Sequence, residues 1–422
     1  MSGNALVLDY VRTPRGKASA KGALRGESAV GLVVGLQREL ARRTSLDVEQ
    51  VEDVVLGCAS QVDEQGADLA RTATLLAQWG DRVPGATINR FCASGIDAVG
   101  QTAARVRAGD LRLAVAGGVE SVSRVPMFAD RGPLWTDAET IRRIGAVHMG
   151  IAADLNATIE EFGREELDAY GLETQQKAAA ARERGAFARS LVPVTAGAGL
   201  PGHDHDRAAR PDGGDREVVL LDHDELVRPQ TTLETLAGLP PAFAALGESG
   251  QDAIALGAYP GVDHIDHLHT VGTSPAMADA AALLLIGDAS AAERAGLRPR
   301  ARIVAAATTA VNPVVMLTAG QSAVEEVIAR AGLRPADIDV FEFAEAFSAL
   351  CLRFRRDLDA GPDRLNPHGG TMAMGHAFGA TGAILVGSCV EALEDRDGRY
   401  GVAAVSGAAG LGVAVLIERL PA

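Results

Sequence analysis

The sequence has few cysteines, few aromatic residues and no excess of basic residues. Its 422 residues include 4 cysteines, and 4% of all residues are Phe, Trp or Tyr. The formal net charge of −15 argues against nucleic-acid binding and against binding to an anionic membrane surface. No uninterrupted apolar run reaches membrane-spanning length, and no signal peptide is recognisable. The four cysteines show neither metal nor disulfide spacing, so we expect a reducing, cytoplasmic environment; they are Cys58, Cys92, Cys351 and Cys389.

The sequence does contain a repeated alternation of short apolar runs and helical patterns. In the first part, we predict strands at residues 5–10, 53–57, 85–91 and 112–117, and helices at residues 28–43, 69–79 and 94–108. The alternation returns after about residue 277, with an apolar run at 277–286, strands at 338–343 and 401–405, and helices at 322–331 and 379–393. This pattern predicts a mixed or parallel sheet covered by helices, in two related α/β halves.

A segment of different composition, residues 121–270, separates the two alternating regions. It contains a charged helix predicted at residues 164–184 and a stretch rich in Gly, Asp, Arg and His at residues 196–216, which we interpret as a mobile surface loop. The segment is interpreted as an insertion that can close over a site on the α/β body. The expected domains are therefore residues 1–276, including the insertion, and residues 277–422.

Cys92 stands where the predicted strand at residues 85–91 breaks into the next helix. A thiol at the start of a helix faces unpaired backbone N–H groups, whose partial positive charge is expected to lower its pKa. The thiolate attacks carbonyl carbons, so Cys92 is a candidate nucleophile. The alternative is an inert core cysteine, because free cysteine is among the most buried residue types.

Three other segments place candidate chemistry beside an apolar strand. His376 lies in a glycine-rich turn within residues 369–382, where the backbone can approach a ligand closely. Residues 341–347 read Phe-Glu-Phe-Ala-Glu-Ala-Phe. Residues 405–413 end a strand in a turn whose backbone N–H groups can face an anion.

In this order and spacing, these segments resemble the thiolase family, whose members make or cleave the carbon–carbon bond of 3-ketoacyl-CoA. The resemblance covers nearly the whole chain and includes the motifs Arg12-Thr13-Pro14, Ala116-Gly117-Gly118-Val119-Glu120-Ser121, His148-Met149-Gly150, Arg228-Pro229-Gln230-Thr231-Thr232-Leu233-Glu234 and Gly375-His376. It implies a layered α/β/α/β/α fold with two similar halves and a long insertion. It also implies a homodimer or homotetramer.

The resemblance assigns roles to individual residues. Cys92 would take the acyl group from acyl-CoA as a thioester, and His376 would be the base that removes the thiol proton. The backbone N–H groups of Cys92 and Ala408 would stabilise the carbonyl oxygen of the acyl-enzyme. Coenzyme A enters as a substrate, with no tightly bound cofactor. Its nucleotide end would meet Arg228, and its pantetheine arm would be lined by Thr235, His148, Met149 and Phe347; for each of these an ordinary surface or core role remains the alternative.

The sequence departs from the family pattern at four positions. The second cysteine, an acid and base for the α-carbon of the second acyl-CoA, falls at Ser406, and a serine hydroxyl is a far weaker acid than a thiol. Ala344 replaces the Asn that begins the Asn-Glu-Ala-Phe motif and positions a water in the second oxyanion hole. Two milder departures are Ala377, in place of a proline, and Pro275, in place of a serine that touches pantetheine.

The two main departures, at Ala344 and Ser406, fall on the carbon–carbon half of the family reaction. We therefore expect the protein to load an acyl group onto Cys92 and to deliver it to an unknown acceptor such as an amine, a hydroxyl, a thiol or water. One alternative is an ordinary thiolase in which Ser406 replaces the second cysteine. Another is a non-catalytic acyl-CoA-binding partner subunit.

Two short segments are rich in potential metal ligands. They are residues 203–206 (His-Asp-His-Asp) and residues 263–269, which contain three histidines and two aspartates. Neither has the spacing of a known structural or catalytic site, so no metal is predicted.

Overall fold

A ten-stranded mixed sheet forms the centre of the computed structural model, which describes residues 3–197 and 218–421. Its strands are β1 (Ala5–Arg12), β2 (Gly16–Lys17), β3 (Asp53–Gly57), β4 (Ala86–Ile88), β5 (Leu113–Ser121), β8 (Ala278–Gly287), β9 (Ala301–Ala310), β10 (Val340–Phe343), β11 (Tyr400–Gly407) and β12 (Leu411–Arg419). The order is β10-β11-β12-β9-β1-β8-β5-β3-β4, with β2 beside β8. The predicted α/β class is confirmed.

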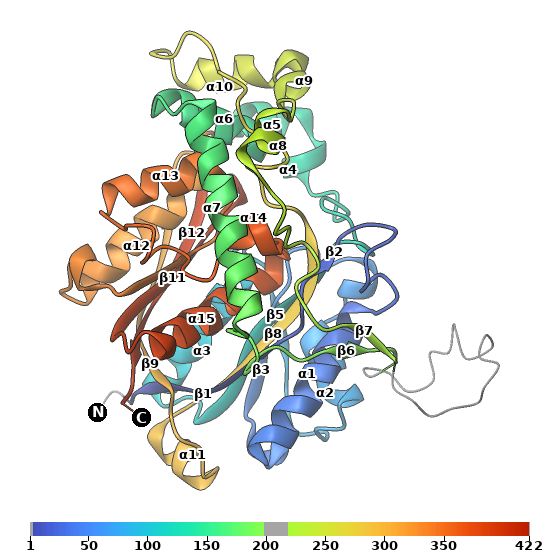
Figure 1. Cartoon of the computed structure of the whole chain (residues 1–422). Helices are drawn as coiled ribbons and strands as arrows, with labels where there is room; N and C mark the ends of the chain where they lie inside the picture. The colour runs from blue at the N-terminus through green and yellow to red at the C-terminus, as the bar shows by residue number, and fades with distance from the viewer. Residues whose placement is uncertain (1–2, 198–217, 422) are drawn as a thin grey trace.

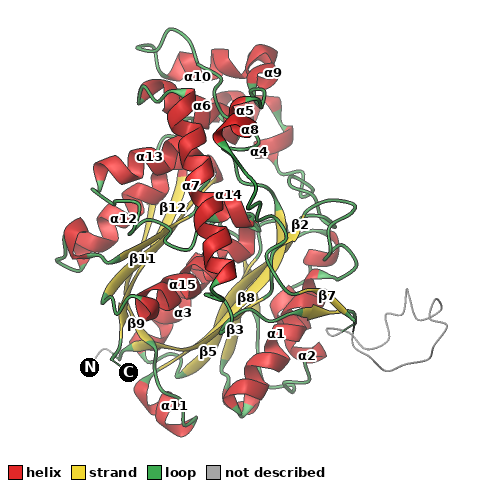
Figure 2. Cartoon of the chain, viewed as in Figure 1, coloured by secondary structure: helices red, strands yellow, loops and turns green. Residues whose placement is uncertain are grey.

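The sheet wraps around two central helices, α3 (Ser94–Ala108) and α15 (Phe378–Asp395). Each of these helices contacts strands from both ends of the sheet: α3 packs on β3, β5 and β12, and α15 packs on β5, β8 and β11. The two halves of the sheet meet in its middle, where β1 pairs antiparallel with β9. On the outer faces lie α1 (Ala29–Thr44) and α2 (Leu69–Leu76) on one side and α12 (Ala319–Arg330) on the other. The result is the expected sequence of α, β, α, β and α layers (Figures 1 and 2).

Small residues let the two central helices touch at their N-termini. A Cβ added to Gly95 would lie 2.3 Å from the carbonyl oxygen of Gly379, and one added to Gly382 would lie 2.3 Å from the amide nitrogen of Ile96. Larger side chains at Gly95 and Gly382 would separate the helices. The first turns of α3 and α15 therefore meet at one place in the molecule, and each begins just after a candidate catalytic residue.

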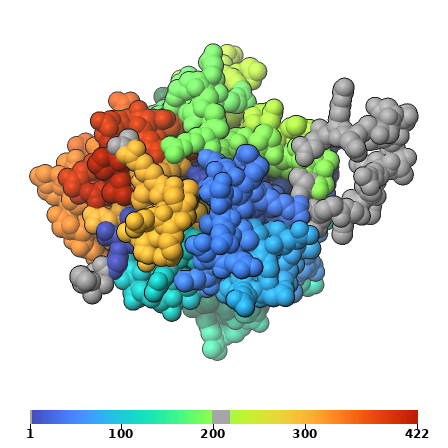
Figure 3. Space-filling view, turned by 90° about the horizontal axis from the view of Figure 1, so that it is seen from below, coloured from blue at the N-terminus to red at the C-terminus, as the bar shows by residue number. Residues whose placement is uncertain are grey.

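Strand β8 bears on where the two halves of the chain divide. It begins at Ala278, where the sequence pattern suggested the start of the second half, yet it pairs with β5 and β1 of the first half. We propose that the halves divide after β8, near residue 288, and not at residue 276. Seen from below, the first half (blue to cyan) and the second half (orange to red) lie side by side (Figure 3).

The insertion forms a helical layer at one end of the sheet (Figure 1). Its helices are α4 (Pro133–Thr136), α5 (Ala138–Ile144), α6 (Met149–Ile159), α7 (Arg164–Glu183), α8 (Leu233–Ala237), α9 (Ala244–Leu246) and α10 (Asp252–Ala258). A separate two-stranded sheet joins β6 (Val194–Thr195) to β7 (Val219–Leu221). Helix α7 packs on α13 (Ser348–Asp357) and α14 (Thr371–Met374), which ties the insertion to the second half. The predicted surface loop falls mainly on residues 198–217, outside the described residues.

The remaining helix, α11 (Ala289–Arg294), connects β8 to β9. Predicted and observed elements agree in type, with shifted ends: the strand predicted at residues 85–91 is confined to β4, and the helix predicted at residues 69–79 ends at Leu76. Within residues 3–197 and 218–421, every helix is too short or too polar to cross a membrane.

Candidate active site

A strained turn carries Cys92 from β4 to α3. Phe91, directly before it, has a φ of 50°, a left-handed conformation that costs a bulky residue on the order of 1–3 kcal/mol. The turn holds itself in place: the Phe91 N–H donates to Asn89 Oδ1 (2.8 Å), and the Ser94 hydroxyl donates to the Phe91 carbonyl (2.6 Å) and accepts from the Arg90 N–H (2.8 Å). The geometry fixes Cys92 at the start of α3, as the sequence predicted.

Two backbone N–H groups converge on the sulfur of Cys92. They belong to Cys92 itself and to Ala408, and each donates to the thiol sulfur and lowers its pKa. Ala408 begins the helical turn after β11, in which Ala409 has a φ of 57°. The two amides predicted to stabilise an acyl-enzyme oxygen therefore meet at Cys92, although they come from opposite ends of the chain.

The expected low pKa of Cys92 is wrong. Burial among surrounding protein atoms, together with the charge of Glu120, raises the pKa of the Cys92 thiol to about 12 despite the two amides. Loss of hydration penalises a thiolate more than two amide dipoles favour it. Cys92 therefore rests as a neutral thiol and needs a base when it reacts.

Glu120 is a residue whose role sequence reasoning missed. Its buried carboxylate accepts hydrogen bonds from the N–H groups of Ala59 (2.9 Å), Ser60 (3.1 Å) and Gly379 (3.0 Å) and from Gln65 Nε2 (2.8 Å). It thereby joins β5, the loop after β3 and the first turn of α15. The sequence does contain a sign of this role, which is a carboxylate near the end of an otherwise apolar strand. A buried charge needs hydrogen-bond partners, so such a residue is expected to join several segments.

His376 is a neutral imidazole in a buried setting. Burial, followed by the positive charge of Arg15, lowers the pKa of His376 to about 4, so the imidazole is uncharged at neutral pH. Its Nδ1 atom lies 2.9 Å from the Thr381 hydroxyl, and its ring packs edge-on against Phe378, with centroids 5.1 Å apart. These contacts fix the ring, and no described residue hydrogen-bonds its Nε2 atom.

The turns that carry His376 and Cys92 lie together. Phe378, which packs on the His376 ring, lines a cavity of about 40 Å³ that is also lined by Cys92 and Ala408. The next residue, Gly379, donates its N–H to Glu120, whose charge acts on Cys92. The structure thus joins the predicted nucleophile and the predicted base through the touching N-termini of α3 and α15.

Ser406 forms hydrogen bonds with the backbone around the start of α12. Its buried hydroxyl donates to the Leu317 carbonyl (2.6 Å) and accepts from the Gly320 N–H (3.0 Å). The one proton of the hydroxyl is therefore used in a hydrogen bond that holds β11 against the start of α12. Ala344 is also buried, and its side chain offers no hydrogen bond.

Glu345, next to Ala344, is the centre of a buried network that the sequence did not reveal. It accepts from Tyr170 Oη (2.8 Å), Thr174 Oγ1 (2.9 Å), Asn366 Nδ2 (3.0 Å) and the Met372 N–H (3.0 Å). Tyr170 and Thr174 belong to α7, so Glu345 fastens the insertion to the second half. In the Ala-Glu-Ala-Phe segment, Glu345 therefore has a structural role.

The residues predicted to hold coenzyme A are divided between two cavities. Arg228 and Thr235 are exposed and line a groove of about 320 Å³. His148 and Met149 line a second cavity of about 300 Å³, and Met149 also lines the cavity of Cys92. Phe347 lines neither of them; it is buried with ring contacts to Phe243 (5.7 Å) and His269 (5.4 Å).

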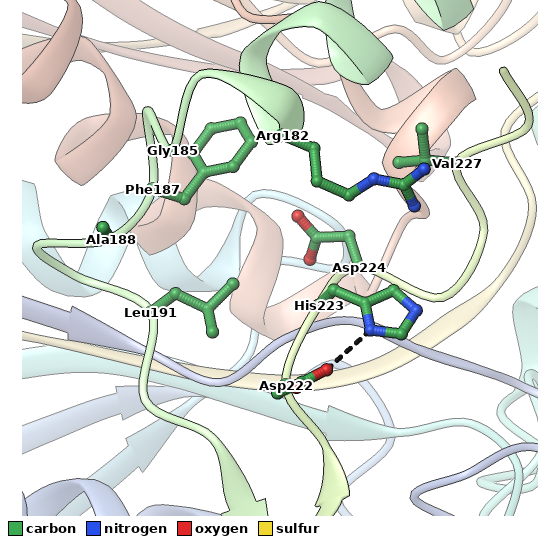
Figure 4. Close-up of a pocket in the computed structure, with 9 residues that line it drawn as sticks. All are labelled: Arg182, Gly185, Phe187, Ala188, Leu191, Asp222, His223, Asp224 and Val227. Atoms are coloured by element: carbon green, nitrogen blue, oxygen red, sulfur yellow. Dashed lines mark hydrogen bonds and ion pairs between the residues drawn. The ribbon is translucent and has the colours of Figure 1, made fainter.

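Arg12, from the first motif, is part of a buried ion cluster. Its guanidinium makes two bonds to Asp224 (2.8 and 3.0 Å), and Arg15 Nη1 lies 3.7 Å from the same carboxylate. Although burial opposes its charge, the two arginines hold the pKa of Asp224 below its usual value. Asp224 also lines a separate cavity of about 180 Å³ beside Phe187 (Figure 4).

The histidines within residues 263–269 are held by carboxylates. His269 Nδ1 lies 2.7 Å from Asp154 Oδ1, and His267 lies between Asp154 (2.9 Å) and Asp252 (3.0 Å). Among the described residues no group of three or more His, Cys, Asp or Glu is arranged to hold a metal ion. The candidate at residues 203–206 lies outside the described residues.

Comparison with known proteins identifies the family. The N-terminal domain model of thiolase matches residues 5–250, and the C-terminal domain model of thiolase matches residues 297–419. The chain belongs to the thiolase family. It is 35% identical to the beta-ketoadipyl-CoA thiolase of Escherichia coli, over 99% of both chains, and 34% identical to a 3-ketoacyl-CoA thiolase of Yersinia pestis, over 99% of this chain and 100% of the relative. The crystal structure of the Bacillus anthracis acetyl-CoA acetyltransferase is similar with a TM-score of 0.82, at 30% identity over 99% of both chains.

Membership of the thiolase family makes this protein an acyl-CoA acyltransferase. The predicted resemblance is thereby confirmed. The names of the relatives specify thioesters of coenzyme A as their substrates.

Proposed function

We propose that this thiolase-family protein forms an acyl-thioester on Cys92, with His376 as the base, and passes the acyl group to an acceptor other than carbon. The loading half is supported by the two N–H groups at the Cys92 sulfur and by the neutral imidazole of His376. The choice of acceptor rests on one observation: the Ser406 hydroxyl already donates to the Leu317 carbonyl.

The loading step follows from the resting states of the two groups. As Cys92 Sγ attacks the thioester carbonyl, its proton moves to His376 Nε2. Negative charge then develops on the carbonyl oxygen, where the N–H groups of Cys92 and Ala408 stabilise it. Collapse of this intermediate breaks the bond to coenzyme A, whose sulfur takes the proton from His376.

The second half reverses these movements with a different nucleophile. An amine, hydroxyl, thiol or water gives its proton to His376 and attacks the acyl carbon. Cys92 leaves as its sulfur recovers the proton. No α-carbon is deprotonated in this sequence, so it needs neither an acid at position 406 nor a polar side chain at position 344.

Condensation of two acyl-CoA molecules places a different demand on the site. A base must remove a proton from the α-carbon of the second acyl group, and a cysteine thiol, with an ordinary pKa of ~8.5, is far better matched to that task than a serine hydroxyl. Ser406 has the additional disadvantage that its proton is bonded to Leu317.

The second candidate is an ordinary 3-ketoacyl-CoA thiolase. It is favoured by the names of the relatives, which are beta-ketoadipyl-CoA and 3-ketoacyl-CoA thiolases. In that case Ser406 would do the work of the second cysteine at the α-carbon. By the same family resemblance we propose that the chain assembles as a homodimer or homotetramer, which light scattering on the purified protein measures.

Intact-mass measurement separates the candidates. The purified protein is mixed with acetyl-CoA, and the adduct is located by peptide mapping; in parallel, thiolysis of acetoacetyl-CoA is followed in the same preparation. We expect a Cys92 acetyl adduct and slow thiolysis. Rapid thiolysis would establish the ordinary thiolase, and absence of the adduct would favour a non-catalytic subunit.

A further inference from the structure

The cavity around Cys92 lies beside a second cavity. The front chamber, of about 40 Å³, is lined by Cys92, and the rear chamber, of about 300 Å³, lies towards α5 and α10. Four residues line both chambers: Phe128, Trp135, Met149 and Ala408. Because they share these residues, the two chambers are neighbours, and a group attached to Cys92 lies next to the rear chamber. The rear chamber alone is at the lower end of the range for small-molecule sites, about 300–1,000 Å³.

Aromatic side chains line both chambers. Trp135 packs against Phe91 with ring centroids 5.7 Å apart and against Phe128 at 4.6 Å. Phe91 and Phe128 both have left-handed backbones, with φ of 50° and 70°. Backbone strain of about 1–3 kcal/mol at each bulky residue persists only where surrounding structure holds it, typically at ligand sites. These rings are therefore a built surface for an apolar group.

The charges around the two chambers exclude one class of acyl group. Among the described residues that line them, Asp130 carries the only carboxylate and no Lys or Arg is present. His148 lines the rear chamber, but burial lowers its pKa, so it is neutral at neutral pH. A carboxylate at the end of an acyl chain would lose its hydration here without gaining a cation, which is costly.

We infer that the two chambers form one acyl pocket for a bulky, uncharged, apolar acyl group, such as one that ends in an aromatic ring, and that they reject a chain ending in a carboxylate. This inference rests on the proposed acylation of Cys92, and it reassigns His148 and Met149 from the pantetheine arm to the acyl group. It separates this chain from its Escherichia coli relative, whose name specifies beta-ketoadipyl-CoA, a thioester of a dicarboxylic acid. Trp135 and Phe128 are then specificity-determining residues of the pocket.

The test compares how fast three thioesters acylate Cys92, measured by rapid quench and intact mass. Acetyl-CoA reports on loading itself, phenylacetyl-CoA on the apolar pocket and adipyl-CoA on the terminal charge. We expect phenylacetyl-CoA to load with a kcat/KM at least about tenfold above that of adipyl-CoA. Equal loading of the two, or faster loading of adipyl-CoA, would overturn the inference. Failure of acetyl-CoA to load would instead overturn the proposed function.

Two substitutions in the rear chamber sharpen the test. Ala146→Trp fills the chamber and should lower the ratio of phenylacetyl loading to acetyl loading by about tenfold or more. Ile141→Arg places a cation in the chamber and should raise adipyl loading while lowering phenylacetyl loading. The matched control is Ala188→Trp, in the separate cavity of Figure 4, which should change none of the three. Phenylacetyl loading that survives Ala146→Trp would show that the rear chamber is not used.

Discussion

Cys92 and Ser406 are both held by backbone groups, but in opposite ways. The backbone N–H groups of Cys92 and Ala408 act on the Cys92 sulfur, which rests as a neutral thiol. The Ser406 hydroxyl accepts a hydrogen bond from the Gly320 N–H and donates one to the Leu317 carbonyl. To act as an acid, a group must release its proton to the substrate, and a hydrogen bond from that proton to a buried carbonyl opposes the release. We therefore expect the site to form an acyl-enzyme at Cys92, whereas the hydroxyl at position 406 holds neighbouring backbone together.

The strongest test of this difference is to remove each side chain in turn. Cys92→Ala should lower acyl loading by at least about 10³-fold, because the nucleophile is lost. Ser406→Ala should leave loading within about twofold of the unmodified protein, because the hydroxyl takes no part in that step. Intact mass after mixing with acetyl-CoA measures both. An adduct that persists in Cys92→Ala would place the acyl group on another residue.

A thiol at position 406 should make this position chemically more similar to Cys92. Ser406→Cys should raise thiolysis of acetoacetyl-CoA by about 10–100-fold, since a positioned acid or base contributes about 10²–10⁴ when its pKa is suitable. The reaction is followed by the loss of acetoacetyl-CoA absorbance. Ser322→Cys, on α12, is the matched control and should change nothing. An unaltered rate in Ser406→Cys would mean that Ser406 is not what limits carbon–carbon cleavage.

The pH dependence of loading should reflect the resting state of the Cys92 and His376 pair. A base with a pKa of about 4 is neutral above that pH, and a thiol with a pKa of about 12 stays protonated below it. Loading should therefore vary by less than about threefold between about pH 5.5 and 8.5, and it should fall as His376 becomes protonated at lower pH. Rates of adduct formation across this range measure it. An inflection near pH 6.5 would contradict the lowered pKa of His376.

The smallest expected effect concerns stability. Ser406→Ala leaves the Leu317 carbonyl and the Gly320 N–H without their partner, which should lower the free energy of unfolding by about 1–3 kcal/mol. Urea denaturation followed by circular dichroism measures the change. Ser322→Ala is the control and should cost less than about 0.5 kcal/mol. No loss of stability in Ser406→Ala would show that its hydrogen bonds do not hold β11 to α12.

The sequence predicted the parts of the site that depend on local order. Cys92 between a strand and a helix, the turn around His376 and the turn at Ala408 are each written in consecutive residues, and the structure has all three in those positions. The α/β class follows from periodicity in the same way. Each of these features is formed by neighbouring residues, so it can be recognised from a short stretch of sequence.

The features that the sequence did not predict depend on contacts between distant segments. The raised pKa of Cys92 comes from burial and from Glu120, and the partners of Ser406 come from Leu317 and Gly320. The four donors to Glu345 come from three parts of the chain. The separation of Arg228 from Met149 into different cavities arises from the packing of the insertion, for which the sequence has no simple pattern.

The most direct test of the central claim compares two rates in one preparation. The first is the rate at which acetyl-CoA acylates Cys92, measured by rapid quench and intact mass; the second is the turnover of acetoacetyl-CoA with coenzyme A. If Cys92 is an active nucleophile and Ser406 is confined to packing, acylation should exceed thiolysis by about 10²-fold or more. Equal rates, or thiolysis without a Cys92 adduct, would contradict the account.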